Sequence, residues 1–255
     1  MVVQVESRKV NFMRGSPLQA FSSYLSSQAA AQEKAYQTQQ PSITISRETG
    51  SGAVTIAQML VEQLNAASKS SGNPASWMVF DRNLAKQVLS DHELPQSLER
   101  FVVEDARLPV EAIVEELLGL HPTQWTLVQH TTKTILRLAS LGRAILVGRG
   151  AEAITSRLPF VFHVRLVAPL ENRIQHASHY YNLTEENAAK MIREADHARR
   201  RYLRRYFDAD VDDPLLYDVV LNTGRLGFVR TAELIAQGAM RHYAEFLETR
   251  PSYTG

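Results

Sequence analysis

The sequence contains no cysteine, which excludes disulfide bonds, thiolate metal sites and cysteine nucleophiles. Long apolar stretches are missing too, because no run approaches the roughly 20 residues that a helix needs to span a bilayer. The N-terminus also lacks the apolar core of a secretory signal peptide. Together these absences predict a soluble, cytoplasmic protein without a membrane partner.

An excess of charge of one sign is missing as well. The 28 Lys and Arg residues are balanced by 27 Asp and Glu residues, so the bulk charge gives no reason to expect binding to nucleic acid or to an anionic membrane. Any basic site must therefore be local. At 255 residues the chain is long enough to bury a substantial core, as one large domain or as one domain with an appendage.

Residues 1–41 differ in composition from the rest of the chain, since they are rich in Ser, Gln and Ala. Phe21, Leu25 and Ala29 follow an i, i+4, i+8 spacing that predicts a helix over about 18–37. This thin apolar stripe indicates an arm that packs on the domain or on a second subunit, and hence a route to a homo-oligomer. Disorder of its first residues is an equal alternative. The domain itself is expected over residues 42–250.

Strand-like and helical patterns alternate after residue 41. The strand-like runs are 42–46, 77–80, 144–148, 160–167 and 218–222. The helical segments include 82–90, 109–118, 124–141, 169–179, 184–207 and 228–247. The aromatic side chains expected in the core are Trp77, Trp125, Phe160 and Phe162. Several strand runs are continuously apolar, as in parallel strands covered on both faces. The alternation predicts an α/β fold with right-handed crossovers, whose ligands bind at the carboxyl ends of the strands.

The stretch 42–60 is the most informative part of the chain. A β-branched run leads into Gly50 and Gly52 and then into a helical pattern. The first amides of such a helix have no intrahelical partners and lie at the positive end of the helix dipole, so they form an anion site. The two glycines would let the backbone approach a phosphate, and Thr55 stands where a hydroxyl reaches a magnesium ion. The alternative is that the glycines only end a strand and begin a helix.

This loop departs from the usual P-loop pattern, which places a lysine next to the hydroxyl residue. Ala53 and Val54 stand at the corresponding positions. Arg47, at the end of the strand, is a candidate replacement for the missing cation, and it is equally a candidate salt-bridge partner of Glu48 or Asp81. The motif is therefore degenerate, and a bound triphosphate would need cations from elsewhere in the chain.

A second informative stretch, 191–207, contains six arginines. On a helix, Asp196 stands three residues after Arg193 and four before Arg200, which places it to orient neighbouring guanidinium groups. The planar fork of arginine matches phosphate oxygens, so this helix is a candidate source of the missing cations. The apolar stripe expected to pack comprises Ala188, Met191, Ile192, Ala195, Ala198, Tyr202 and Tyr206.

Two other interpretations of this basic helix stay open. In the first, the helix is solvated, and its arginines pair with the acids that follow it, Asp208, Asp210, Asp212 and Asp213. In the second, it binds RNA or DNA. The neutral overall charge and the lack of stacking aromatics on the arginine faces count against nucleic acid.

Five different short motifs follow one another along the chain. They are Ile-Thr-Ile-Ser-Arg-Glu with a Gly-Ser-Gly loop, Phe80-Asp81-Arg82, Val147-Gly148-Arg149-Gly150-Ala151, the segment from Phe162 to Arg173, and the stretch 213–223. In order and spacing they resemble the cytidylate kinase-like branch of the P-loop nucleoside monophosphate kinases. The resemblance covers roughly residues 42–240.

The resemblance implies a fold and a set of site residues. The fold is a three-layer P-loop kinase-like α/β fold with a five-stranded parallel sheet and an arginine-rich helical lid over about 184–215. The donor-phosphate loop would comprise Arg47, Thr49, Gly50, Ser51, Gly52, Ala53 and Thr55, with Thr55 also on Mg²⁺. The substrate site would include Asp81, Arg82, Arg149 and Asp218. The catalytic residues around the transferring phosphoryl group would be Arg149, Arg193, Asp196, Arg199 and Arg200.

We therefore expect a nucleotide-binding kinase that uses ATP and Mg²⁺ to phosphorylate a nucleoside monophosphate of the CMP or dCMP type, or another small acceptor. The alternative is a non-catalytic nucleotide sensor, or an oligomeric assembly module with a degenerate loop. The missing lysine favours the alternative. The retained Thr55 and the lid arginines favour the kinase.

Overall fold

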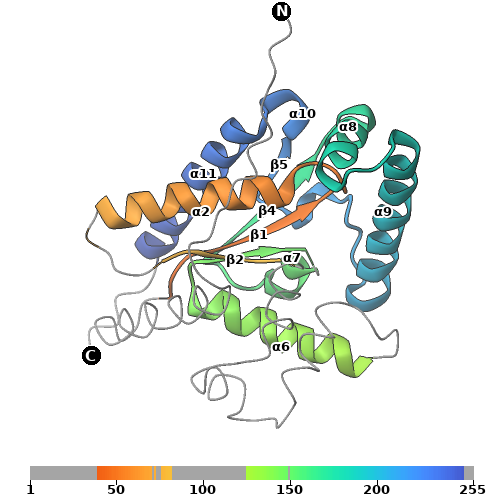
Figure 1. Cartoon of the computed structure of the whole chain (residues 1–255). Coiled ribbons are helices and arrows are strands. Elements are labelled where there is room, and N and C mark those ends of the chain that lie inside the picture. Colours follow the sequence, from red (N-terminus) through yellow and green to blue (C-terminus); the bar gives the residue numbers. More distant parts are fainter. Residues whose placement is uncertain (1–38, 71, 73–75, 82–124, 149, 250–255) are drawn as a thin grey trace, which may run out of the picture.

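The computed structural model describes residues 39–70, 72, 76–81, 125–148 and 150–249, and its centre is a five-stranded sheet (Figure 1). The strands are β1 Ser42–Arg47, β2 Met78–Phe80, β3 Ala144–Val147, β4 Val161–Val167 and β5 Val219–Asn222. Their order in the sheet is β2-β3-β1-β4-β5, and all neighbours are parallel. The central position of β1 brings the turn that follows it between two other strand ends.

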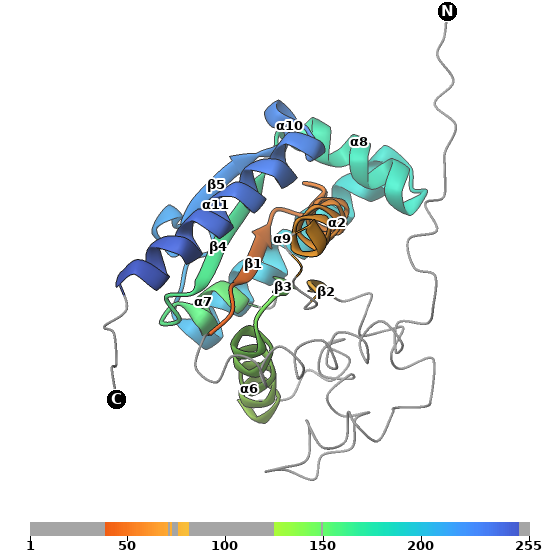
Figure 2. The same cartoon turned by 90° about the vertical axis from the view of Figure 1, so that its left-hand side faces the viewer.

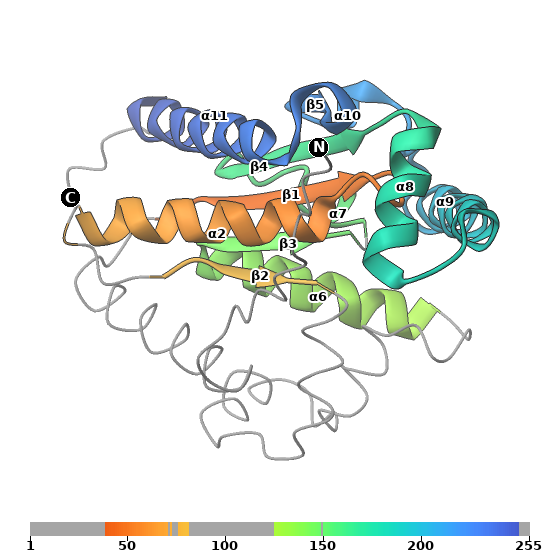
Figure 3. The same ribbon diagram turned by 45° about the horizontal axis from the view of Figure 1, so that its top comes forward.

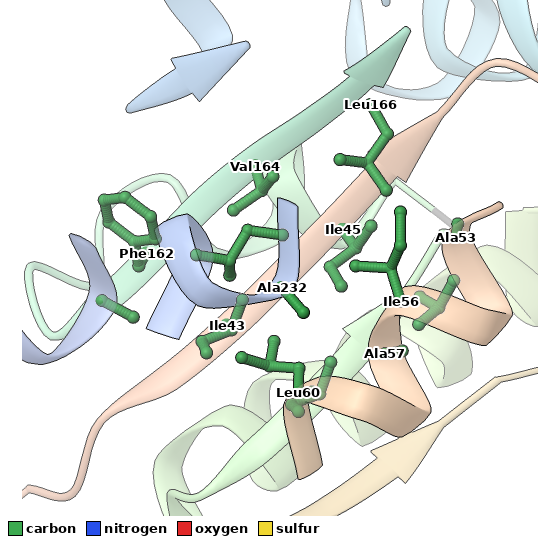
Figure 4. Close-up of a cluster of buried hydrophobic side chains, with 14 of the residues drawn as sticks. Ile43, Ile45, Ala53, Ile56, Ala57, Leu60, Phe162, Val164, Leu166 and Ala232 are labelled. Atoms are coloured by element: carbon green, nitrogen blue, oxygen red, sulfur yellow. The ribbon is translucent and has the colours of Figure 1, made fainter. Parts of the chain in front are cut away.

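One face of the sheet packs against α2 (Ala53–Ser70) and α11 (Phe228–Thr249). Alternate residues of a strand point to the same face, and Ile43, Ile45 and Val164 on this face are 0% exposed (Figure 4). The helices meet them with residues at helical spacing, among them Ile56, Ala57, Leu60, Ala232, Ile235 and Ala239. Each fully buried Ile, Leu or Val side chain in this cluster stabilises the fold by about 1.5–3 kcal/mol.

The other face is covered by α6 (Trp125–Leu141) and α7 (Ala151–Thr155). Figure 2 looks nearly along α2 and shows β2 and β3 between α2 and α6. Leu146 and Phe160 belong to a smaller apolar cluster on this face. The middle of the face is polar, because the Thr44 hydroxyl and His163 Nδ1 form a buried hydrogen bond of 2.8 Å.

Helices α8 (Leu170–Tyr181) and α9 (Glu185–Phe207) lie at the end of the sheet to which β1 and β4 point (Figure 3). The α9 helix begins where the Thr184 hydroxyl accepts a hydrogen bond from the amide of Asn187. The short elements η1 (Pro214–Leu216) and α10 (Thr223–Leu226) flank β5 and lead into α11. The carboxyl ends of the central strands therefore face two helices that come from the second half of the chain.

The expected parallel α/β fold is confirmed, and the five expected strands appear within one or two residues of their expected bounds. The helices expected over 124–141, 169–179, 184–207 and 228–247 are present as α6, α8, α9 and α11. The short helices α7 and α10 were not expected from the sequence. The helices expected over 82–90 and 109–118, and the one expected over 18–37, lie outside the described residues.

The apolar stripe expected on α9 is partly wrong. Ala188 and Ile192 are buried as expected, but Ala198 is exposed. The buried face continues instead through Asp196 and Leu203. Because Asp196 is paired with guanidinium groups, it can be buried on a face that a purely apolar criterion assigns to its neighbours.

No helix in the described ranges is both long enough and apolar enough to cross a membrane.

Candidate functional site

The turn after β1 closes on itself and on β4. The Glu48 amide donates to the carbonyl of Leu166, 2.9 Å away, which continues the pairing of β1 with β4. The amide and the hydroxyl of Ser51 both donate to the carbonyl of Glu48, at 3.2 and 2.8 Å. From α10, the Thr223 hydroxyl donates to the carbonyl of Ser51 at 2.9 Å. These hydrogen bonds hold the turn in one shape.

Gly50 and Gly52 are both required by this shape. Each has a φ of +86°, in the region that side-chain-bearing residues rarely adopt. A Cβ on Gly50 would lie 2.5 Å from the carbonyl oxygen of Arg173, and one on Gly52 would lie 2.5 Å from the ring of Phe228. The glycines thus allow α8 and α11 to pack against the turn, and their presence does not by itself indicate a phosphate site.

The carboxylate of Asp196 is the meeting point of the site. Its Oδ1 accepts a hydrogen bond from the amide of Thr49 at 2.8 Å. The guanidinium of Arg173, on α8, donates to Oδ2 at 2.6 Å, and that of Arg199 donates to Oδ1 at 2.8 Å. Arg173 also lies 3.5 Å from Glu48, and Arg199 donates to the Thr49 hydroxyl at 3.2 Å. Two guanidinium groups and the amide of Thr49 therefore converge on the carboxylate of Asp196, beside the turn after β1.

Burial sets the electrostatics of this group. Burial alone would raise the pKa of Asp196, but the hydrogen bonds from Thr49 and the charges of Arg199 and Arg173 outweigh it, so that its pKa lies below the ordinary value. The pKa of Arg199 is lowered by burial, which Asp196 opposes. Asp196 is therefore a carboxylate over the whole physiological pH range.

A second buried polar group lies beside the first, on the face of the sheet covered by α7. Arg165, on β4, is 4% exposed and donates to the hydroxyl of Ser46 at 3.0 Å and to Asp212 at 2.8 Å. The Tyr217 hydroxyl donates to the carbonyl of Val211 at 2.8 Å and lies 3.2 Å from the Ser46 hydroxyl. Burial and the charge of a nearby carboxylate, Glu152, raise the pKa of Tyr217 to about 12.

Glu152, in the first turn of α7, is 2% exposed. Burial raises its pKa, and the charges of Arg47 and Arg165 and a hydrogen bond with Ser46 reduce that rise. Among the described residues its Oε2 has no hydrogen-bond partner. Glu152 also acts electrostatically on Arg199, so the two buried groups belong to one charged network at the carboxyl ends of β1 and β4.

The start of α2 offers the remaining features of an anion site. No acidic residue stands in its first turn. Within the described part of the chain, no hydrogen bond engages the amides of Gly50, Gly52, Ala53, Val54 and Thr55. These amides lie at the positive end of the helix dipole.

Among the described residues of this turn, the candidate protein ligand for magnesium is the hydroxyl of Thr55. The described residues contain no group of three or more His, Asp or Glu side chains that could hold a metal ion. Mg²⁺ in nucleotide sites takes few protein ligands and is held largely by water and by the substrate's phosphates. A single hydroxyl next to free amides therefore fits a metal that arrives with a nucleotide.

The structure brings together only some of the residues expected in the site. Thr49, Asp196 and Arg199 meet at the turn. Arg193 is exposed, and Arg200 is exposed and pairs with Asp212 at 2.6 Å. The pairing of Arg200, like that of Arg204 with Asp210, follows the alternative in which this helix pairs with the acids that come after it.

The expected residues on the other strand ends lie in different surroundings. Arg47 lies directly against Gly148, because a Cβ on that glycine would lie 1.7 Å from its guanidinium. Asp81 follows β2 and acts electrostatically on Tyr180 of α8. Asp218 directly precedes β5, and its carboxylate accepts a hydrogen bond from the amide of His163 at 2.7 Å. Arg82 and Arg149 lie outside the described residues.

Four charged residues of the network were not expected from the sequence, namely Glu48 as a partner of Arg173, Arg173 itself, Arg165 and Glu152. Arg165 carried a usable signal, since an arginine inside an otherwise apolar strand needs a buried partner. Arg173 and Glu152 carried none, because each stands on a helix where exposure to solvent is the ordinary expectation.

Comparisons with known proteins agree with this architecture. Residues 42–225 match the model of the cytidylate kinase-like family. The cytidylate kinase of Natronomonas pharaonis is 24% identical over 189 residues, which cover 72% of this chain and 81% of that enzyme. A uronate isomerase of Corynebacterium glutamicum is 23% identical over 117 residues, or 46% of this chain, and the match spans 22% of that enzyme's length.

A solved structure of an uncharacterized protein from Eubacterium ventriosum superposes with a TM-score of 0.54 at 18% identity, covering 83% of this chain and 100% of that one. It shows a likeness of fold alone. The family match covers more than half of the chain and includes the turn after β1 and both helices that supply guanidinium groups to it. This protein therefore belongs to the cytidylate kinase-like family.

Proposed function

We propose that this protein is a phosphotransferase that moves the γ-phosphoryl group of ATP onto a nucleoside monophosphate of the CMP or dCMP type, or onto another small acceptor. One observation carries the proposal: the guanidinium groups of Arg173 and Arg199, from two different helices, lie against the turn after the central strand. That turn is where the family's donor phosphates would bind.

The donor side of the site is assigned to the turn and to the start of α2. The amides of Gly50, Gly52 and Ala53 would contact the phosphates, with the dipole of α2 behind them. Arg47, Thr49 and Ser51 complete the loop. Thr55 would contribute its hydroxyl to Mg²⁺, which when bound supplies charge neutralisation between the phosphates.

We assign α9 and the segment after it, about 184–215, to a lid. Phosphoryl transfer depends almost wholly on positioning and on neutralisation of charge, so cations near the transferred group are the main contribution that the protein makes. Arg199 supplies such a cation from the side of α9 that faces the turn after β1. Arg193 and Arg200 stand on the exposed side of α9 and would reach the phosphates only if α9 shifts.

The acceptor side rests on the family resemblance. Arg149 would face the acceptor phosphate, and Asp81, Arg82 and Asp218 would contribute to substrate binding. The position of Arg47 against Gly148 supports a cationic environment at the end of β3. A guanidinium group there suits an acceptor that itself carries a phosphate.

The test compares two arginines of the same helix. Arg199→Gln removes the cation at the turn, whereas the matched control Arg204→Gln breaks an exposed pair with Asp210. ATP consumption is measured with Mg²⁺ and with CMP, dCMP or UMP. We expect acceptor-dependent turnover, reduced about 10²- to 10³-fold in Arg199→Gln and nearly unchanged in the control. Equal loss in both variants, or turnover without need of an acceptor, contradicts the proposal.

A second candidate function is a nucleotide sensor that does not catalyse transfer. The neutral side chains of Ala53 and Val54, where a P-loop lysine would stand, favour it. The predicted N-terminal arm would then join subunits into an assembly. Calorimetric binding of ATP together with no consumption of ATP for any of the three acceptors would select this candidate.

A further inference from the structure

The three donors around Asp196 form a receptor for an anion. They are the amide of Thr49 and the guanidinium groups of Arg173 and Arg199, with donor–acceptor distances between 2.6 and 2.8 Å. They come from three separate parts of the chain. Their geometry therefore depends on the folded protein and not on a local sequence motif.

The receptor is shielded from water. The side chains of Arg173 and Asp196 are each 11% exposed, and that of Arg199 is 19% exposed. Charge-assisted hydrogen bonds are strong in such surroundings. A phosphoryl oxygen is the same type of acceptor as a carboxylate oxygen, and it carries at least as much charge.

We propose that Thr49, Arg173 and Arg199 form the seat of a phosphoryl group, and that the carboxylate of Asp196 is an internal occupant that the phosphoryl group displaces. The proposal rests on the proposed function for the identity of the phosphoryl donor. In this proposal Asp196 does not stay in place to orient the two guanidinium groups when the ligand binds. The side chain competes with the ligand for the same donors.

Competition follows from the chemistry of the site. A carboxylate and a phosphoryl group in one shielded receptor would repel each other, and the Thr49 amide has a single hydrogen to donate. The apparent affinity for phosphate is then reduced by the fraction of molecules in which Asp196 still holds the donors. If Asp196 instead only orients the two guanidinium groups, its removal weakens phosphate binding.

The two cases differ in sign, and Asp196→Asn separates them. The substitution keeps the size of the side chain and removes its charge. Asp210→Asn is the matched control, because it removes the same charge from an exposed pair with Arg204. Binding of inorganic pyrophosphate to the full chain is measured by calorimetry. We expect Asp196→Asn to bind pyrophosphate about tenfold or more tightly than the unmodified protein, and Asp210→Asn to bind it equally.

If Asp196→Asn is less stable than the unmodified protein, the shift in the thermal unfolding midpoint caused by pyrophosphate still reports binding. Removing the carboxylate leaves Arg173 and Arg199 without their shared counter-ion, so the unfolding midpoint should fall. Pyrophosphate should then raise the midpoint of Asp196→Asn more than that of the unmodified protein or of Asp210→Asn. The double variant Asp196→Asn with Arg199→Gln should lose this gain, which places the anion at the receptor.

The outcomes for the receptor and for the proposed function are separable. Pyrophosphate binding that is unchanged or weaker in Asp196→Asn overturns the displacement proposal, even if the unmodified protein consumes ATP. Tighter binding in Asp196→Asn supports it, even if no acceptor is ever phosphorylated. In that second case the receptor stands and the kinase proposal fails.

Discussion

Glu152 is a carboxylic acid in the interior that burial makes harder to ionise. Since its pKa is higher in the folded chain than in the unfolded one, the folded state binds this proton more tightly. Its contribution to the free energy of unfolding is therefore fully present at pH below the unfolded pKa, and it is lost as the pH rises through the raised folded pKa. A glutamine in place of Glu152 does not titrate, so it would make no pH-dependent contribution of this kind.

The substitution Glu152→Gln should therefore change the pH dependence of stability. We expect the free energy of unfolding of the variant, relative to that of the unmodified protein, to increase as the pH rises from the ordinary range of a glutamate pKa toward neutrality. Urea unfolding at a series of pH values measures it. Glu233→Gln, on the exposed side of α11, controls for the substitution itself. A pH-independent difference for Glu152→Gln would contradict the expectation.

At the scale of single residues, the sequence predicted part of the candidate site. Thr49, Asp196 and Arg199 were expected in it and contact one another, and their roles in binding stay predictions. Arg173 was not expected, because its role depends on α8 packing across the turn, a contact with no local signature. A motif shows which residues are near in sequence, whereas this receptor joins Thr49 to residues that are more than a hundred positions away.

The turn that joins β1 to α2 is held by packing as well as by hydrogen bonds. Gly52 and Gly227 both have positive φ, of +86° and +73°. Only at Gly52 would a Cβ overlap a neighbour, the ring of Phe228, whereas nothing lies within 4 Å of a Cβ on Gly227. The pair therefore separates backbone strain from steric overlap.

Gly227 has φ +73° and ψ 164°, a backbone conformation that is essentially restricted to glycine, so for Gly227→Ala we expect a loss of about 1–3 kcal/mol from backbone strain alone. Gly52→Ala should lose about 1–3 kcal/mol more, because the added methyl group forces Phe228 to move. Denaturant unfolding of the two variants gives the difference directly. Equal losses would show that α11 does not hold the turn in place.

At the scale of elements, the sequence predicted where the strands and long helices lie better than it predicted which side of a helix is buried. The bounds of α9 were expected within one residue at each end. Its buried face was not, because Asp196 is buried with its charge neutralised by Arg199 and Arg173. Periodicity of apolar residues cannot detect a face that is held by ion pairs.

At the scale of the whole molecule, alternation of strands and helices was sufficient to predict the parallel α/β sheet, and a ligand site at the carboxyl ends of its strands stays a prediction. It did not predict the strand order, which places β1 between β3 and β4. That order, together with the return of α8 and α9 across the strand ends, creates the receptor. Both depend on packing between distant segments, and a single sequence carries little information about it.

Binding of phosphate to this end of the molecule should stabilise the entire fold, because the turn is tied to β4, α8, α9 and α10 by hydrogen bonds. A ligand at one hundred times its Kd adds about 2.7 kcal/mol to the free energy of unfolding. For a domain of this size that corresponds to a rise in Tm of about 5–10 °C. We expect ATP with Mg²⁺ to produce such a rise in scanning calorimetry, and adenosine, which shares the base and sugar but has no phosphate, to produce almost none. A rise of equal size with adenosine would show that the base is recognised instead, and the turn after β1 would then lose its part in binding.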